Sequence, residues 1–319
     1  MTRPLHLALE IDGAGAQSGA GVRAVGAVAE NAGFTFVTID DSLTPAPAGP
    51  AVRLDAVVRA AFLARTTSRL GIVPLAHPAT TEPFHLASQL AALDHATEGR
   101  AGWLVGSVSV PDAAAALDRP VPADGAALTA EIADVVEVAQ RLWDSWEDDA
   151  VVRDTASGRY IDRERLHYVD FESTPDGRPG FSVKGPLIVP RGPQGRPVVV
   201  ARHGTVPNDL IDIVLVAPDA AQSRSAAGPK VFVDLPFALA GHGSAATLTD
   251  QLRRLHGQVD GVRLVPADPA ADVPLLVRDV LPPLRVERRT ATPRPGATLR
   301  DTLGLARPTN RYATSGSIR

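Results

Sequence analysis

The sequence contains no cysteine and a single methionine, and aromatic residues make up only 4% of it. The absence of cysteine excludes disulfide bonds, thiolate catalysis and zinc sites built on sulfur. No run approaches the roughly 18 consecutive apolar residues of a membrane-spanning helix, and the N-terminal residues MTRPLHLALEIDGAG do not resemble a signal peptide. The formal net charge of −4 gives no electrostatic reason to expect nucleic acid or an anionic membrane as a partner. A soluble, cytoplasmic, globular protein is therefore expected.

A regular alternation of strand-like and helix-like segments indicates the fold. Eight short apolar runs predict strands of the kind that is buried on both faces of a parallel sheet: 5–11, 34–40, 70–76, 101–107, 197–201, 212–217, 230–236 and 261–266. Helical patterns lie between them, at 22–33, 53–67, 83–97, 128–146, 245–259 and 273–286, the last broken at Pro282. Eight β units with alternating helices predict a (β/α)8 TIM barrel of the α/β class.

The chain departs from a plain barrel in two places. The stretch from Arg141 to Pro197 holds two of the three Trp and two of the three Tyr, and it is punctuated by Gly and Pro. An irregular excursion of this length is usually functional or disordered, and its spaced aromatic residues favour order. We therefore expect one barrel over residues 1–286, with an insertion at about 147–196 after the fourth β/α unit. Residues 287–319 are expected to wrap the outside of the barrel, with a partly disordered end.

An open, doubly wound sheet is the alternative fold. It would require a glycine-rich dinucleotide loop after the first strand, and the segment GAGAQSGAG (13–21) is rich in glycine at that point. The spacing of these glycines is not that of the GxGxxG fingerprint. Asp40 and Asp41 do end the second predicted strand, where such sheets carry an acidic residue. The alternative therefore stays open on the sequence alone.

In a barrel, functional side chains lie on the loops at the C-terminal ends of the strands. The polar residues and the one glycine of interest at those predicted ends are Glu10, Asp12, Asp40, Asp41, Ser42, His77, Thr80, Thr81, Ser107, Ser109, Arg202, His203, Gly204, Thr205, Asp234 and His242. The segment RHGTVPNDL (202–210) is the best candidate for an anion site. Gly204 would allow close approach of the backbone, Thr205 would cap the following helix, and Arg202 or His203 would add positive charge. An ordinary strand-to-helix turn is the alternative, and no metal-binding motif stands out.

Four stretches resemble a known family. They are EPFHLASQLAALDHATEGRAGW (82–103), the insertion, the strand PVVVA (197–201) and the segment ATLRDTLGLARPTNRY (297–312). In this order along the chain they closely resemble the flavin-dependent monooxygenases of the bacterial-luciferase-like superfamily. The nearest branch contains the nitrilotriacetate, dibenzothiophene-sulfone and pristinamycin-IIA monooxygenases.

The resemblance implies a two-component monooxygenase. A separate flavin reductase would supply reduced FMN, and the enzyme would oxidise a small organic substrate with O2. The resemblance also implies which residues face the cofactor: Asp40, His77, Leu104, Ser107, Arg202, His203, Gly204 and Thr205. Relatives place the flavin phosphate at a turn like that of Gly204 and Thr205. They are commonly dimers through helices of the early half, which implies a homodimer through the predicted helices 53–67 and 83–97.

Several positions depart from the family pattern. Relatives read GGRAGWN at the fourth strand, where this chain has Leu104 in place of the asparagine. A Ser/Thr cluster after the third strand is replaced by His77-Pro78-Ala79, and the tyrosine that opens the helix after the fourth strand is absent. Two further hypotheses therefore stand beside the monooxygenase. One is a non-catalytic barrel that has lost flavin and serves as a partner subunit, and the other is a relative that uses a deazaflavin.

Overall fold

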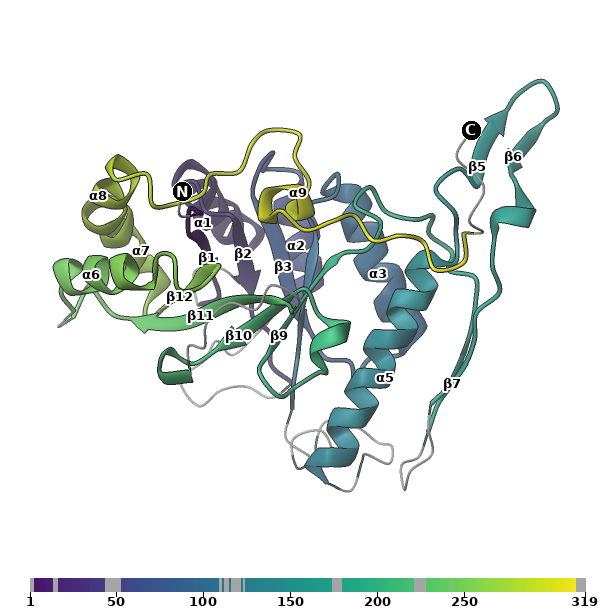
Figure 1. Ribbon diagram of the computed structural model, residues 1–319, viewed down its shortest axis with the longest axis horizontal. Helices are drawn as coiled ribbons and strands as arrows, with labels where there is room; N and C mark the ends of the chain where they lie inside the picture. The colour runs from purple at the N-terminus through teal and green to yellow at the C-terminus, as the bar shows by residue number, and fades with distance from the viewer. Residues whose placement is uncertain are drawn as a thin grey trace.

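The computed structural model describes residues 3–13, 17–43, 53–108, 111, 115, 122, 124–173, 180–220, 228–241 and 243–313. Ser109, His242 and the end of the tail, 314–319, lie outside this described part. Eight parallel strands form a closed barrel in the order β1-β12-β11-β10-β9-β4-β3-β2 (Figure 1). The predicted TIM barrel is confirmed. The open sheet is excluded, because β1 and β2 pair with each other and close the ring.

The strands lie where the apolar runs placed them. They are β1 (His6–Glu10), β2 (Phe36–Ile39), β3 (Gly71–Ala76), β4 (Gly102–Val105), β9 (Val198–Arg202), β10 (Ile213–Val216), β11 (Lys230–Phe237) and β12 (Gly261–Pro266). Most of their residues are buried, because one face lines the barrel interior and the other is covered by helices. The interior is filled by Ala8, Phe36, Val73, Leu75, Leu104, Val198, Val200, Ile213, Leu215 and Phe232.

Helices follow most strands, and those named here begin at a capping side chain except for α8. They are α1 (Gly19–Asn31), α2 (Ala56–Ala64), α3 (Pro83–Ala96), α5 (Gly125–Asp144), α6 (Ala245–Leu255), α7 (Pro269–Leu275), α8 (Leu281–Val286) and α9 (Leu299–Leu303). Ser18, Asp55 and Asp124 accept hydrogen bonds from backbone N–H groups in the first turns of α1, α2 and α5. Of the helices described, none has the length and apolar character needed to cross a membrane.

The segment predicted as a helix broken at Pro282 is helical throughout. A π-helical turn, η5 (Leu276–Val280), joins α7 to α8, so that the chain stays helical from Pro269 to Val286. Pro282 lies in the first turn of α8, where a proline is tolerated. The irregularity in the helix therefore lies just before Pro282. The wider π turn accommodates the proline without ending the helix.

Two barrel connections differ from the standard unit in the residues that are described. Between β9 and β10 every residue is described, and the segment forms only a 3-10 turn, η3 (Asn208–Leu210), without a side-chain cap. After β10 the described residues form another 3-10 turn, η4 (Pro218–Ala220). The expected role of Thr205 as a helix cap was therefore wrong. A phosphate at this turn would meet no helix N-terminus.

The described residues of the insertion form two antiparallel strand pairs outside the barrel. Strand β5 (Val151–Asp154) pairs with β6 (Arg159–Ile161), and β7 (Asp170–Glu172) pairs with β8 (Ser182–Lys184), both antiparallel. A 3-10 turn, η2 (Arg163–Arg165), lies between them. Figure 1 shows the β5–β6 hairpin projecting beyond one end of α5, while β7 runs alongside that helix. The insertion follows the fourth β/α unit, as the sequence predicted.

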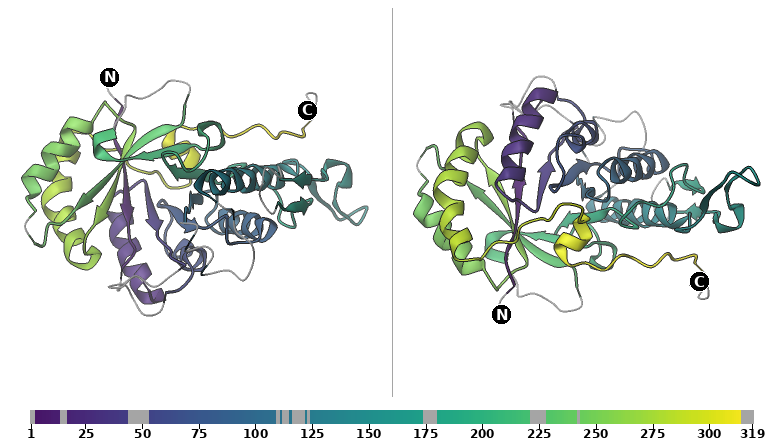
Figure 2. Two further views of the ribbon diagram at one scale, coloured as in Figure 1. Left: turned by 90° about the horizontal axis from the view of Figure 1, so that it is seen from below. Right: turned by 90° about the horizontal axis from the view of Figure 1, so that it is seen from above.

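The tail closes one end of the barrel before it reaches the insertion. Leu299 and Leu303 of α9 join the apolar cluster inside the barrel, and a Cβ atom on Gly71 would lie 2.7 Å from Leu299. Gly71 is the first residue of β3, so α9 covers the end at which the strands begin. Both views of Figure 2 show the tail continuing from α9 along α5 toward the insertion. The tail therefore packs into the barrel in addition to wrapping it.

Candidate functional site

The barrel interior is apolar where the strands begin and polar where they end. Phe36, Phe232 and Val200 belong to the apolar interior, and side chains two residues apart on a strand point to the same face. The residues two positions after Phe36, Phe232 and Val200 are polar. The residues two positions after Ala8 on β1 and Gly261 on β12 are polar as well. We call this layer the polar mouth; it consists of Glu10, Thr38, Arg202, Asp234 and Arg263.

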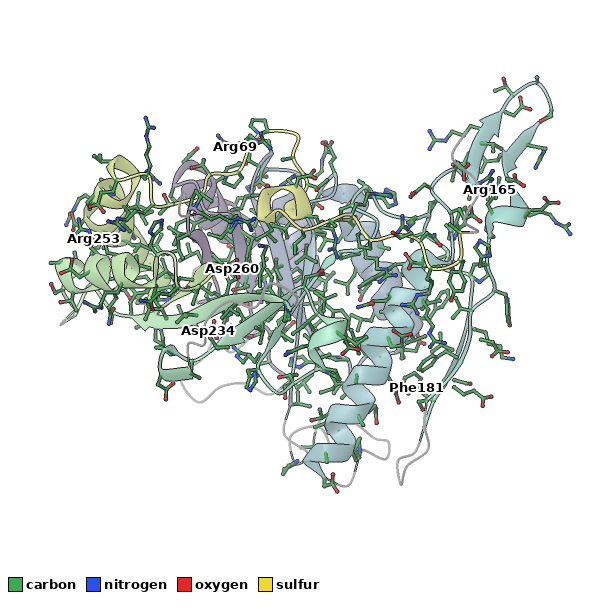
Figure 3. The ribbon with its side chains drawn as sticks, in the orientation of Figure 1. Arg69, Arg165, Phe181, Asp234, Arg253 and Asp260 are labelled. Carbon is green, nitrogen blue, oxygen red and sulfur yellow. The ribbon has the colours of Figure 1, made fainter. Side chains whose placement is uncertain are left out.

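Arg263 connects the polar mouth. Its side chain is only 3% exposed and forms a two-pronged ion pair with Asp234, at 2.6 and 2.8 Å. Its Nη1 donates to a carboxylate oxygen of Glu10 at 3.0 Å and to the Thr38 hydroxyl at 3.2 Å. Figure 3 marks Asp234 on β11. The attraction between the guanidinium and the two carboxylates offsets the free energy that each charged group loses when it is removed from water.

Glu10 is a buried carboxylate at the end of β1. Its Oε1 accepts hydrogen bonds from the backbone N–H groups of Asp12, at 2.9 Å, and Asp40, at 3.3 Å. Its Oε2 accepts the Thr38 hydroxyl at 2.6 Å. Burial raises the pKa of Glu10 to about 7, while the Arg263 guanidinium acts in the opposite direction. The charge of the polar mouth therefore changes near neutral pH.

Two arginines, one before α2 and one within it, hold the loops that follow β1 and β2. Arg53 and Arg59 pair with the Asp12 carboxylate at 2.5 and 2.7 Å. Both guanidinium groups also donate to the carbonyl oxygen of Asp40. The Asp40 carboxylate accepts the backbone N–H of Asp41 at 2.9 Å. Asp40 therefore shapes the rim of the polar mouth mainly through its backbone.

His77 follows β3 and lies against the end of β4. A Cβ atom on Gly106 would lie 2.6 Å from Nδ1 of His77, so the glycine makes room for the imidazole ring. Both ring nitrogens are shielded from solvent and make no hydrogen bond of normal geometry with the described residues. Burial lowers the pKa of His77, partly offset by the carboxylates of Asp41 and Asp40. A buried polar group without a hydrogen-bond partner costs free energy, and this favours a bound ligand as the partner of His77.

The turn from Arg202 to Thr205 is open and carries positive charge. Gly204 has a φ of 80°, and a Cβ atom there would meet nothing within 4 Å. The Arg202 side chain is 47% exposed and forms a loose ion pair with Asp234 at 3.7 Å. The backbone N–H groups of His203 and Thr205 already bond to carbonyl oxygens. An anion here would therefore be bound by side chains and by close approach at Gly204.

Leu104 and Ser107 lie at different depths of β4 and the loop after it. Leu104 is 0% exposed and belongs to the apolar cluster inside the barrel. Ser107 lies beyond the end of the strand and is exposed. Leu104 therefore contributes to an apolar floor below the polar mouth, while Ser107 offers a hydroxyl above it.

The structure arranges the expected cofactor-facing residues in two groups. Asp40 lies close enough to His77 to influence its pKa, on the side of β2 and β3. The turn from Arg202 to Thr205 forms the other group and is linked to the polar mouth by the Arg202–Asp234 ion pair. In the part of the chain that is described, no group of three or more His, Asp or Glu residues is arranged to hold a metal ion.

Four residues of this region had no predicted role: Thr38, Arg53, Arg59 and Arg263. Arg263 stands alone in the apolar run GVRLVP (261–266), and a charge in a strand buried on both faces requires a partner. That isolated charge is a signal from which its role could be predicted. Thr38, Arg53 and Arg59 carry no such signal, because polar residues at strand ends and on amphipathic helices are usually exposed.

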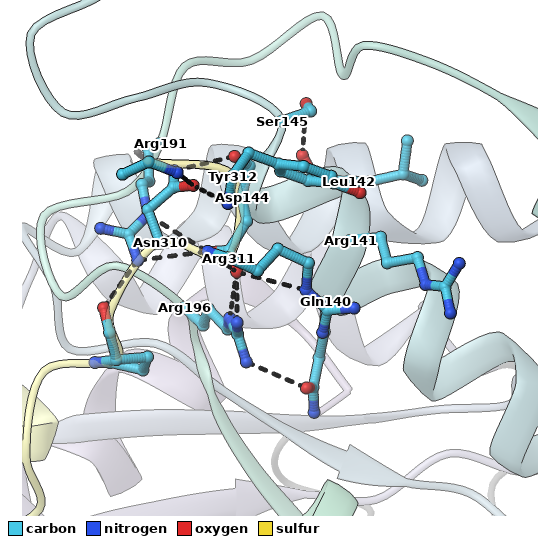
Figure 4. A network of polar contacts seen from close by, with 12 residues as sticks. Gln140, Arg141, Leu142, Asp144, Ser145, Arg191, Arg196, Asn310, Arg311 and Tyr312 are labelled. Atoms are coloured by element: carbon cyan, nitrogen blue, oxygen red, sulfur yellow. Dashed lines mark hydrogen bonds and ion pairs between the residues drawn. The ribbon is translucent and has the colours of Figure 1, made fainter. Parts of the chain in front are cut away.

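A second buried network joins the insertion and the tail to α5. Asp144, the last residue of α5, is fully buried and accepts hydrogen bonds from Arg191 at 3.1 Å and Arg196 at 2.9 Å. The backbone N–H of Arg311 donates to the same carboxylate at 3.3 Å, and the Asn310 side chain donates to the Asp144 carbonyl oxygen at 2.8 Å. Figure 4 shows these side chains meeting at Asp144. The network holds the insertion in place beside the barrel.

Comparison with known proteins identifies the class to which this fold and site belong. The family model for luciferase-like monooxygenases matches residues 6–205. The chain is also 37% identical over 317 residues to one of the subunits of pristinamycin IIA synthase from Streptomyces pristinaespiralis, a match that covers 98% of this chain and 99% of the relative. The chain therefore belongs to the luciferase-like monooxygenase family, and it is a flavin-dependent monooxygenase by class. The family resemblance expected from the sequence is confirmed.

Further relatives and solved structures agree with this assignment. Nitrilotriacetate monooxygenase component A of Aminobacter aminovorans is 33% identical over 200 residues, which are 62% of this chain and 42% of the relative. The structure of EDTA monooxygenase from Chelativorans sp. BNC1 matches with a TM-score of 0.75 at 18% identity, over 96% of this chain and 99% of that chain. A long-chain alkane monooxygenase matches with a TM-score of 0.76 at 15% identity, over 95% and 96%. These structures support the fold alone.

Proposed function

We propose that this protein is the oxygenase component of a two-component monooxygenase that uses reduced FMN. A separate flavin reductase would supply the reduced flavin, and a small organic substrate would be oxidised with O2. Membership of the family supports the reaction class. The observation that carries the site is that the open, positively charged turn at Gly204 and the imidazole of His77, whose shielded ring nitrogens have no partner of normal hydrogen-bond geometry among the described residues, follow strands at the same end of the barrel.

The residues of this end fit the parts of the cofactor. The phosphate would be held by Arg202, His203, Gly204 and Thr205. His77 would hydrogen-bond to the polar edge of the flavin ring, Leu104 would lie in the apolar floor, and Ser107 would add a hydroxyl. Asp40 would hold the rim in place. Bound flavin supplies the electrons and the activation of O2, and the task of the protein is to orient the reactants and exclude water.

Titration of the purified protein with FMN, and anaerobically with reduced FMN, tests this proposal. We expect saturable binding, followed by absorbance and fluorescence. The Arg202→Ala variant should bind roughly 10- to 100-fold more weakly, because a charge-assisted hydrogen bond to phosphate contributes about 1.5–3 kcal/mol. Thr205→Ala should weaken binding about 5-fold, the effect of losing one neutral hydrogen bond of roughly 1 kcal/mol.

Arg253→Ala is the matched control for the titration. Arg253 lies on α6, on the outside of the barrel and well away from Asp234 (Figure 3). Its removal should leave FMN affinity at the level of the unaltered protein. The proposal fails if neither redox state of FMN binds, or if the Arg202 and Arg253 variants lose affinity to the same extent.

A flavin-free partner subunit is the second candidate function. It is favoured by the lack of a helix after β9, by the backbone N–H groups of His203 and Thr205 that are already bonded, and by Leu104. The relative that matches along its full length is one component of a synthase, and another component of the same synthase is 30% identical over 108 residues, 34% of this chain and 20% of that relative. This chain would then assemble with a homologue of that other component. Flavin binding by the co-purified pair but not by the chain alone would support this candidate.

We further propose that the chain alone forms a homodimer through α2. Leu54, Val58 and Phe62 are 44%, 57% and 45% exposed. Val58 and Phe62 lie four residues apart on α2 and so on one side of the helix, and Leu54 comes two residues before the helix begins. Arg23 of α1 lies 5.2 Å over the Phe62 ring, so α1 borders the same surface. An apolar stripe in this position is typical of an interaction surface.

Phe62→Glu is expected to convert the dimer into a monomer, because a carboxylate would have to be desolvated at the centre of the interface, a cost that a pair with the neighbouring Arg23 would offset only in part. Size-exclusion chromatography with light scattering measures the mass directly. Val286→Glu is the control, since Val286 is 83% exposed but lies on α8, away from this stripe. An unaltered protein that is monomeric at all concentrations, or a Phe62 variant that remains dimeric, contradicts the proposal.

A further inference from the structure

A cavity of about 470 Å³ lies beyond the end of β3. Its walls come from three parts of the chain: the loop after β3 with the start of α3, the helix α5, and the residues at the start of β8 in the insertion. Sites for small organic molecules typically measure about 300 to 1,000 Å³. The cavity therefore has the size of such a site, and one of its walls is supplied only by the insertion.

Each wall of the cavity contributes apolar surface. Pro78 lines it from the loop after β3, Pro83 from the first turn of α3, Val135 from α5 and Phe181 from the insertion. These four side chains offer contact area and no hydrogen bonds. Pockets for small organic molecules are built in this way, with a mostly apolar lining and a few polar groups that fix the orientation of the ligand. The cavity therefore favours a ligand with an apolar body.

The insertion wall is built on Phe181. Its backbone N–H donates to Oγ of Ser173 at 2.8 Å, and its carbonyl oxygen accepts the Ser173 N–H at 2.9 Å. Its ring stacks on Phe171 with 5.9 Å between centroids, and Arg141 of α5 lies 5.1 Å over the Phe171 ring. Figure 3 shows Phe181 beside α5. The aromatic wall is thus in position before a ligand arrives, which lowers the entropy cost of binding.

The charged side chains among the described residues that line the cavity are already engaged. The two carboxylate oxygens of Glu82 accept the backbone N–H groups of Phe84, at 3.0 Å, and His85, at 2.6 Å, and so cap α3. Glu131 of α5 is only 7% exposed and has an interaction partner of its own. No Lys, Arg or His is among these lining residues. A charged ligand would therefore lose its hydration without gaining a counter-charge, which costs free energy.

The other polar groups of the lining are hydroxyls. Thr81 supplies one from the loop after β3, and Ser182 supplies one from the insertion wall. A hydroxyl both donates and accepts hydrogen bonds, so it can pair with an uncharged oxygen of a ligand without any proton being lost or gained. The polar part of the lining therefore also suits a ligand without charge.

We propose that this cavity is the substrate site and that the substrate is an uncharged, largely apolar organic molecule that packs on Phe181. An alcohol, ether or carbonyl oxygen of this molecule would pair with the hydroxyls of Thr81 and Ser182. Pro78 directly follows His77 in the chain, so the ligand would lie beside the proposed flavin site. The assignment of the ligand as a substrate rests on the proposed monooxygenase function, whereas its binding can be measured without flavin.

Three probes of one shape test the substrate class by isothermal titration calorimetry at neutral pH: cyclohexylmethanol, cyclohexylmethylamine and cyclohexanecarboxylate. We expect the alcohol to bind at least about 10-fold more tightly than either charged probe, because an ammonium or carboxylate group would be desolvated without a new partner. A charged probe that binds as tightly as the alcohol, or more tightly, overturns the proposed class.

Two variants of Phe181 test the aromatic wall. Phe181→Ala should weaken binding of cyclohexylmethanol by about 10-fold or more, because the apolar contact with the ring is lost. Phe181→Leu keeps most of the apolar surface and should stay within about 3-fold of the unaltered protein. Circular dichroism and thermal unfolding confirm that each variant is folded.

Two variants at exposed positions complete the test. Ser182→Trp narrows the cavity from the insertion wall without removing a buried side chain, and it should weaken binding of the alcohol by about 10-fold or more. It probes the same wall if Phe181→Ala does not fold. Tyr168→Ala is the control, because this aromatic residue of the insertion is 62% exposed and does not line the cavity. Its removal should leave binding of the alcohol unchanged.

The outcomes distinguish the two proposals. Unchanged binding of the alcohol in folded Phe181→Ala or Ser182→Trp protein overturns the assignment of the cavity. Selective, Phe181-dependent binding of the alcohol in a protein that binds neither redox state of FMN leaves the cavity as a site for uncharged molecules and overturns the proposed oxygenase function. FMN binding without binding of the alcohol overturns the cavity proposal alone.

Discussion

Replacing Asp144 by alanine is expected to lower the free energy of unfolding by about 3–5 kcal/mol, the cost of breaking a buried ion pair from one side. The Asp144 side chain is 0% exposed, and the Arg191 side chain that pairs with it is 2% exposed. Arg196 shares the same carboxylate. The variant therefore leaves two guanidinium groups in or near the protein interior without their common anion. Urea unfolding followed by circular dichroism measures the loss.

The same variant should loosen the tail, because the backbone N–H of Arg311 also loses its acceptor. Limited trypsin digestion is expected to cut first after Arg311, ahead of any site in the barrel. Asp149→Ala is the control, since Asp149 is 61% exposed and pairs with Arg165 at the surface. Exposed pairs contribute about 0–1 kcal/mol. Similar unfolding free energies for the two variants would refute the role given to Asp144.

Replacing Arg263 by methionine is expected to cost about 3–5 kcal/mol of unfolding free energy at pH 8. The guanidinium is the group that connects Glu10 with Asp234, and its removal leaves these two carboxylates with only the looser Arg202–Asp234 ion pair, at 3.7 Å, as compensation. Methionine keeps much of the volume, so that the loss measures the charge rather than a cavity. Urea unfolding at constant ionic strength measures the effect.

The loss at Arg263 should depend on pH through Glu10. The pKa of Glu10 in the folded protein is raised to about 7, and removal of the opposing guanidinium raises it further. A raised carboxyl pKa means that the folded state holds its proton more firmly than the unfolded chain, so this group stabilises at low pH and the contribution is lost as the pH rises through the folded pKa. The deficit of Arg263→Met should therefore be smaller at pH 5 than at pH 8.

A double variant, Arg263→Met with Glu10→Gln, controls for this pH dependence. The glutamine cannot ionise, so the difference in deficit between pH 5 and pH 8 should become smaller. Arg278→Met serves as the surface control, because the Arg278 side chain is 70% exposed and should change stability by no more than about 0.5 kcal/mol. A deficit larger at pH 5 than at pH 8 would show that Glu10 does not govern the effect.

The barrel strands could be predicted from the sequence because each is a local apolar run. A strand buried on both faces has little room for polar residues. Runs such as 70–76 and 212–217 can therefore be recognised as strands from their own residues alone. The helices were predictable for the same reason, since their periodicity lies within a single segment. The insertion was recognisable because its aromatic residues and its frequent Gly and Pro fit neither the strand pattern nor the helix pattern.

The anion site shows where local reasoning failed. The turn at Gly204 was predicted correctly as a glycine turn after a strand, and its φ of 80° agrees with that expectation. The helix expected after Thr205 does not form, and the short connection from β9 to β10 contains only a 3-10 turn. Whether these residues bind a flavin phosphate therefore depends on side-chain charge, which the titration of Arg202→Ala measures.

The sequence by itself determined the order of the barrel strands, most of the helices, the barrel class and the family, because hydrophobic periodicity and motifs are properties of neighbouring residues. Only the tertiary structure decided the polar mouth and the cavity between α5 and the insertion. Arg263 meets Glu10 across 253 positions of sequence, and Phe181 lines the same cavity as Val135 of α5 only because the insertion folds back along that helix. Such contacts arise when the barrel closes and the insertion packs, and no single segment contains the information that specifies them.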